Sequence, residues 1–114
     1  MKDQYKKWTE DQIKQVWAKG RPVAGYDPDE YRQDIAGALM RYSEYGNTND
    51  EFGFGWEIDH RRPESLDGTD DISNLRPLQW SNNRSKSDNY PGWTSVVSFG
   101  RNRNIRKFQR WALN

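Results

Sequence analysis

The stretch WEIDHRRPESLDGTDDISNLRPLQWSNNRSKSD, residues 56–88, holds the residues that decide how this chain folds and what it can do. It contains the only histidine of the chain, His60, directly after Asp59. Asn74 and Asn83 follow, and Lys86 comes three residues after Asn83. A lone Asp-His pair is usually structural or incidental, and a lone Asn-x-x-Lys carries almost no information. The ordered combination is more specific and indicates a functional site.

The pattern of apolar residues predicts a strand, a loop, a second strand and a helix across this stretch. Residues 51–58 alternate small or polar with large apolar side chains, which is typical of a strand. Residues 74–79 predict a short strand that its proline confines to a sheet edge. Ser81 is suited to cap a helix that begins at Asn82. The end of the first strand and the start of this helix can then face each other.

Such an arrangement brings a carboxylate, an imidazole and an amide oxygen to one edge. Carboxylate, amide and water oxygens suit a hard divalent cation such as Mg²⁺, so Asp59 and Asn83 are candidate ligands. His60 would be free to act as a general base, because an unperturbed histidine pKa of about 6.5 suits proton transfer near neutral pH. The metal would polarise a phosphodiester while His60 takes a proton from the attacking water.

These residues resemble the motifs of the HNH endonuclease family in its ββα-metal, or His-Me finger, form. The family's Asp-His-x-x-Pro, Asn-Leu-x-x-Leu and His/Asn-x-x-Lys elements are matched by residues 59–63, 74–78 and 83–86. Residues 82–91 are especially similar to the HNH domain of RNA-guided CRISPR nucleases. The resemblance covers about residues 54–92, and the flanking segments carry no comparable motif.

The resemblance implies an α+β fold class with a small ββα-metal core and flanking helices. Asp59 and Asn83 would be metal ligands, and His60 would be the general base. Asn74 would hold the loop between the strands and so fix the direction of His60. Lys86 would contact a phosphate or support the site from the helix.

The resemblance also bears on cofactors. The asparagine at position 83, in place of histidine, implies Mg²⁺ or Mn²⁺. Many relatives carry two Cys-x-x-Cys pairs for structural zinc, but this chain has no cysteine, so a zinc ribbon is excluded. Six Trp, six Tyr and four Phe are expected to build the core instead, with Trp17, Trp56 and Trp80 inside it.

The 114 residues predict a single domain with extensions on both sides of the core. The N-terminal extension, residues 1–37, is expected to be helical. A capping box at Thr9 predicts a helix over 9–19, and Asp27-Pro28 predicts another over 28–34. A short strand is expected at 38–42. The C-terminal part, 93–114, is expected to be a basic arm, with a strand or extended segment at 93–99 and a helix at 102–113.

The net charge is only +1, but no acidic residue follows Asp88. A basic end suits a polyanion such as DNA, although a bare charge run is often only a solvated face. Trp93 and Trp111, which lie among basic residues, are candidates for base stacking. The residues expected to contact phosphates are Arg61, Arg84, Arg101, Arg103, Arg106, Lys107 and Arg110.

The favoured function is a metal-dependent endonuclease that nicks one DNA strand per active site with little sequence specificity. A targeting partner protein or a homodimer would complete its action in a phage or defence setting. The alternatives are a non-catalytic DNA-binding module of the same fold and a toxin domain neutralised by an immunity protein. The polar start MKDQYKKWTEDQ and the lack of a long apolar run predict a cytoplasmic, bacterial or phage-encoded protein without a membrane span.

Overall fold

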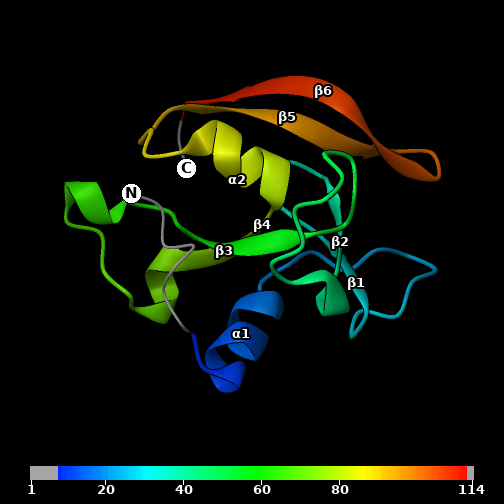
Figure 1. Ribbon diagram of the computed structural model, residues 1–114, viewed down its shortest axis with the longest axis horizontal. Helices are drawn as coiled ribbons and strands as arrows, with labels where there is room; N and C mark the ends of the chain where they lie inside the picture. Colours follow the sequence, from blue (N-terminus) through cyan, green and yellow to red (C-terminus); the bar gives the residue numbers. More distant parts are fainter. Residues whose placement is uncertain (1–7, 113–114) are drawn as a thin grey trace.

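Three two-stranded antiparallel sheets and two helices organise residues 8–112, the part of the chain that the computed structural model describes (Figure 1). The mixture of helices and strands agrees with the α+β class. No helix in this part is long and apolar enough to cross a membrane. The elements are α1 (Glu10–Trp17), β1 (Tyr31–Gln33), β2 (Leu39–Arg41), β3 (Trp56–His60), β4 (Leu75–Gln79), α2 (Trp80–Lys86), β5 (Trp93–Gly100) and β6 (Arg103–Trp111).

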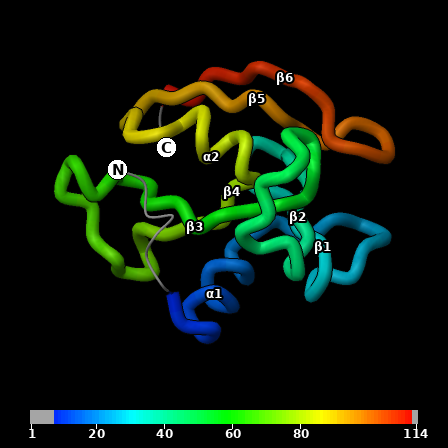
Figure 2. Tube along the Cα trace, viewed as in Figure 1, coloured from blue at the N-terminus to red at the C-terminus, as the bar shows by residue number. Residues whose placement is uncertain are grey.

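The elements stack in layers, and the short helix α2 lies in the middle. The trace places the β5–β6 hairpin on one side of α2 and the β3–β4 pair on the other, with α1 beyond that pair (Figure 2). Strand β3 pairs with β4 from Trp56 opposite Gln79 to His60 opposite Leu75. The strand, loop, strand and helix order expected for the central stretch is therefore present.

The core beneath β3 and β4 contains large aromatic side chains. Trp17 and Trp56 are buried with ring centroids 5.1 Å apart, and Tyr42 packs against both. Val16, Met40, Ile58 and Leu75 fill the rest of this cluster. Aromatic packing thus takes the place of a larger aliphatic core, as the composition indicated.

Helix α1 begins where the sequence predicted. Thr9 Oγ1 accepts a hydrogen bond from Gln12 N at 3.0 Å, and Gln12 Oε1 accepts one from Thr9 N at 2.8 Å, which completes the capping box. The helix ends at Trp17, two residues before the expected end. Helix α2 begins at Trp80 with Gln79 as its N-cap, so the cap expected at Ser81 is wrong.

The helix expected over 28–34 is wrong, because the Asp27-Pro28 signal makes a single turn. Asp27 O accepts hydrogen bonds from Glu30 N and Tyr31 N, and β1 then pairs with β2. The strand expected over residues 51–58 is present, but its expected start at residue 51 is wrong. Residues 51–55 turn tightly past Asn47, and a Cβ on Gly55 would lie 1.7 Å from Asn47 O, so the strand begins at Trp56.

The helix expected over 102–113 is wrong: residues 103–111 form β6, which pairs with β5, and residue 113 lies outside the described part. The register explains the misleading spacing. From Ser95 to Val97 the partner strand advances by three residues, from Gln109 to Arg106, because β6 carries a bulge. A spacing of three on a bulged strand imitates one face of a helix.

Asn82 connects α2 to its neighbours through buried hydrogen bonds. Its Oδ1 accepts from Val96 N and Val97 N, and its Nδ2 donates to Val97 O and Asp34 Oδ2. Asp34 Oδ2 also accepts from Gln79 N, while Oδ1 accepts from Ala36 N and Ala38 N. The fully buried side chain of Asn82 therefore joins α2 to β5 and to the turn between β1 and β2.

We predict that Asn82→Ala lowers the free energy of unfolding by about 3 kcal/mol, because several buried polar groups lose their partners together. Urea unfolding followed by tryptophan fluorescence measures the change. Asn102→Ala, in the exposed β5–β6 turn, is the control and should stay within about 0.5 kcal/mol of the parent. Equal stabilities for the two variants would contradict this assignment.

Candidate active site

Strand β3 directs its acidic residues toward α2. Asn83 of α2 bonds to Glu57, and Lys86 of α2 pairs with Asp59, so these two carboxylates share one face of the strand. His60 instead contacts the loop between β3 and β4. The alternation of a strand therefore separates the two acidic side chains from the imidazole.

Asp59 is completely buried between two cations. Its Oδ2 accepts a hydrogen bond from Arg76 Nε at 3.0 Å, and its Oδ1 lies 3.2 Å from Lys86 Nζ. Arg76 stands directly opposite Asp59 in the β3–β4 register. Burial lowers the pKa of the Arg76 guanidinium, and the charge of Asp59 acts in the opposite direction. Pairing makes the burial of this carboxylate possible.

Asn83 presents an unsatisfied oxygen in the same region. Its Nδ2 donates to Glu57 Oε1 at 2.9 Å, and Glu57 Oε2 is held by Arg84 Nη2 at 2.8 Å. Asn83 Oδ1 is buried and accepts no hydrogen bond from any residue of the described part. A buried amide oxygen without a donor is costly, and a cation would satisfy it.

His60 is 5% exposed and is held by the loop that follows it. Its Nε2 lies 2.7 Å from Asp70 Oδ1 and 4.0 Å from Glu64 Oε2. The Trp8 ring lies 5.8 Å from the imidazole, between centroids. In the neutral ring, an Nε2–H donated to Asp70 leaves the lone pair on Nδ1, which is the state a base needs.

Asn74 closes this loop onto the residues after His60. Its Oδ1 accepts from Arg62 N at 2.9 Å, and its Nδ2 donates to Arg62 O at 3.1 Å and Thr69 O at 2.8 Å. Asn74 O also accepts from Arg61 N. These are side-chain to backbone bonds of the kind expected for Asn74, and its effect on catalysis stays a prediction.

Lys86 lies inside the protein, and none of its side chain is exposed. Its Nζ donates to His60 O at 3.0 Å while pairing with Asp59. The one ammonium group therefore touches both of the adjacent residues Asp59 and His60. Arg61 and Arg84, by contrast, are exposed beside the site.

The expected phosphate-binding residues of the tail lie on β6 and the turn before it, across α2 from β3 (Figure 1). Arg106 forms an ion pair with Glu51. Trp93 is 1% exposed, so the expectation that it stacks on bases is wrong. Trp111 is half-buried and stacks on Trp93, with ring centroids 6.0 Å apart. The tail residues that are exposed are Arg101, Arg103, Arg106, Lys107 and Arg110.

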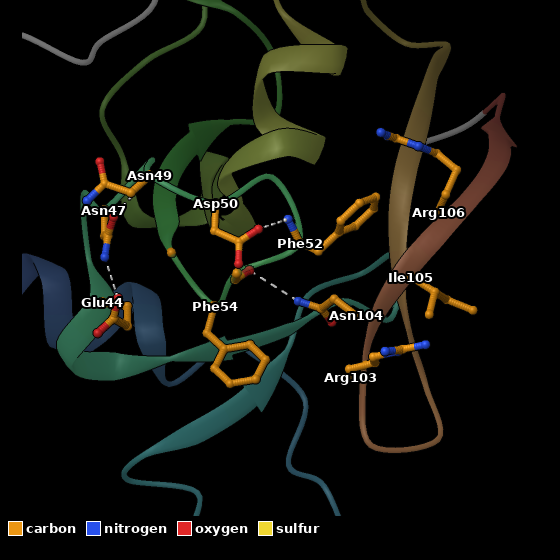
Figure 3. A pocket seen from close by; sticks show the side chains of 12 residues that line it. Glu44, Asn47, Asn49, Asp50, Phe52, Phe54, Arg103, Asn104, Ile105 and Arg106 are labelled. Atoms are coloured by element: carbon orange, nitrogen blue, oxygen red, sulfur yellow. Dashed lines mark hydrogen bonds between the residues drawn. The ribbon is translucent and has the colours of Figure 1, made fainter.

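A cavity of about 730 Å³ lies between the 44–55 loop and β6 (Figure 3). Asn104 Nδ2 donates to Gly53 O and so joins its two walls. Phe52 and Arg106 line it, with the guanidinium 5.0 Å from the ring centroid. None of the expected catalytic or metal-binding residues lines this cavity, so its volume does not mark the catalytic centre.

Sequence reasoning missed three residues of the site: Glu57, Asp70 and Arg76. Strand alternation could have found Glu57, because it lies two residues before Asp59. No local signal identifies Asp70 or Arg76, whose partners are set by the loop and the strand register. Asp70 also belongs to a second group that could hold a cation, since ligand atoms of His60, Glu64 and Asp70 all lie within 4.8 Å of one another.

Comparison with known proteins gives a match to a protein-family model. Residues 49–89 match the family model described as HNH endonuclease, and this range contains β3, β4, α2 and the loop between the strands. No curated protein and no solved structure matches the chain. The matched residues include every expected catalytic and metal-binding position. Residues 49–89 are thus similar to the HNH endonuclease family.

Proposed function

We propose that this protein is a metal-dependent endonuclease that hydrolyses DNA phosphodiester bonds, nicking one strand per active site with little sequence specificity. The family match supports the endonuclease class. The observation that carries the site is the buried Asn83 Oδ1 without a hydrogen-bond donor in the described part. In this proposal β3, β4 and α2 are the ββα-metal core, and the exposed arginines of β6 contact DNA phosphates.

Asp59 and Asn83 would hold Mg²⁺ or Mn²⁺. Their carboxylate and amide oxygens are the hard donors that these ions prefer, and Asn83 Oδ1 needs a partner. When bound, the metal would stabilise negative charge on the phosphate and the leaving oxygen. Lys86 Nζ lies 3.2 Å from Asp59 Oδ1, so the metal would share this carboxylate with an ammonium group.

His60 would take the proton of the attacking water on Nδ1. The Asp70 carboxylate supports this role, because it lies where it can accept a hydrogen bond from His60 Nε2–H and so fix the direction of the ring. Lys86 supports it as well, since its bond to His60 O holds the backbone of the base beside Asp59. The complete burial of Lys86 favours this positioning role over a phosphate contact.

The cluster of His60, Glu64 and Asp70 supports a second arrangement of the same function. In it, the cation binds the imidazole and the two carboxylates, and His60 is a ligand instead of a base. The two arrangements differ in which side chains control metal affinity. A DNA-binding module without catalysis would retain DNA affinity whatever metal is added, and would not nick.

We predict that His60→Ala abolishes nicking of supercoiled plasmid, with a loss of about 10²- to 10⁴-fold, while the protein still binds Mn²⁺ and DNA. The assay compares Mg²⁺, Mn²⁺ and EDTA. Wild-type nicking that requires metal and disappears in the variant supports the proposed function. Substantial residual nicking by the variant would rule out His60 as the base.

Metal titration separates the two arrangements. We predict that Asn83→Ala weakens Mn²⁺ binding by about tenfold or more, because it removes an amide ligand, while Glu64→Gln leaves the affinity unchanged. Isothermal calorimetry on the folded variants measures both. The reverse pattern would move the cation to the His60, Glu64 and Asp70 cluster.

We predict that Asp70→Asn slows nicking by about 10- to 100-fold at saturating DNA, because an amide does not hold the imidazole as a carboxylate does. The KM for DNA should stay unchanged, since Asp70 contacts the general base, His60, and not the DNA. Asp70→Glu is the matched variant that keeps the charge and should recover part of the rate. A change confined to KM would be inconsistent with a positioning role.

A further inference from the structure

A second cavity, of about 560 Å³, opens where the chain leaves α1 and passes the outer edge of β4. It is bounded by residues 19–22, 33–35 and 75–77, with Arg61 at its side. Four cationic side chains line it: Lys19, Arg21, Arg61 and Arg76. No function proposed above uses Lys19 or Arg21.

Positive charge in this cavity exceeds negative charge. Of its described lining residues only Asp34 is acidic, and both oxygens of that carboxylate accept hydrogen bonds from buried donors of the protein. Arg76 is paired with Asp59, outside the cavity. A single carboxylate cannot balance Lys19, Arg21 and Arg61 together, so the lining keeps a net positive charge.

Lys19 and Arg21 are held in place by neutral groups. Lys19 Nζ donates to Leu75 O at 2.7 Å and to Ile72 O, and Arg21 Nη2 donates to Asp34 O at 3.3 Å. Carbonyl oxygens orient a cation without cancelling its charge. Burial lowers the pKa of Lys19, and the nearby charge of Arg61 lowers it further, so these cations repel each other across the cavity.

The cavity also has an apolar side. Pro22, Ile35 and Pro77 line it, and Ile35 is 46% exposed although it is a large aliphatic residue. Cations beside an exposed aliphatic surface match a nucleotide unit, in which a charged phosphate adjoins a less polar sugar ring. A free inorganic anion would use only the cations.

Two lining residues connect the cavity to the candidate active site. Arg61 directly follows His60 in the chain, and Arg76 both lines the cavity and bonds to Asp59. A strand whose scissile phosphate lies at Asp59 and Asn83 could therefore continue into this cavity along the edge of β4.

We propose that this cavity is a nucleotide subsite in which Lys19, Arg21 and Arg61 hold a phosphodiester of the substrate strand away from the scissile bond, with its sugar against Ile35. The inference rests on the proposed nuclease function, because it names where the same substrate continues. It assigns the segment after α1 a part in DNA binding.

The test is DNA binding by fluorescence anisotropy in EDTA, where no cleavage occurs, with Arg21→Ala beside Lys14→Ala. Lys14 is exposed on α1 and does not line the cavity, so the control removes the same charge from nearby. We expect Arg21→Ala to weaken binding about tenfold and to reduce the slope of log affinity against log salt by about one phosphate contact. Lys14→Ala should bind like the parent protein.

Equal affinities and salt slopes for Arg21→Ala and Lys14→Ala would overturn the subsite. Arg21→Lys retains the charge and should bind more tightly than Arg21→Ala, and thermal unfolding of all three shows that they remain folded. The subsite would also be overturned if inorganic phosphate or a mononucleotide competed as strongly as an oligonucleotide. The cavity would then bind a free anion. Plasmid nicking is measured separately. If the wild-type protein does not nick but Arg21→Ala still weakens DNA binding, the proposed catalysis is contradicted and the subsite is not.

Discussion

The buried hydrogen bond between Asn82 Nδ2 and Asp34 Oδ2, 3.0 Å long, fixes the layer on which the site depends. It joins α2 to the turn between β1 and β2, and the same asparagine bonds to the backbone of β5. Burial raises the pKa of Asp34, while its four hydrogen bonds act in the opposite direction. Because α2 is only seven residues long, its position comes from these contacts and not from its own helical stability.

Neighbouring residues of α2 have different roles, one in holding the fold and the others in the candidate active site. Asn82 faces Asp34 and β5, whereas Asn83 and Lys86 face β3. Every group proposed for catalysis is thus held by a residue from another element: Asn83 by Glu57, Asp59 by Arg76, and His60 by Asp70. Such cross-element support allows a small protein without disulfides or zinc to fix catalytic side chains.

The features that the sequence predicted are those with local signals. The capping box at Thr9, strand β4 and the approach of α2 to β3 follow from short motifs. The features that it did not predict depend on distant pairing. Strand β6 is fixed by its pairing with β5, and its bulge erases the period-two alternation that identifies a strand. Asp70 and Arg76 are recognisable only when the loop and the strand register bring them to His60 and Asp59.

The hairpin formed by β5 and β6 has a further consequence for the behaviour of the free protein. Within the described part of the chain, β6 pairs only with β5, so its other side is a sheet edge, which is a common route to aggregation. The strand carries Arg103, Arg106, Lys107 and Arg110 and no acidic residue. Like charges oppose the pairing of this edge with the same edge of another copy. The residues proposed to attract DNA would therefore also keep molecules apart before DNA is bound, an effect that weakens as salt screens the charges.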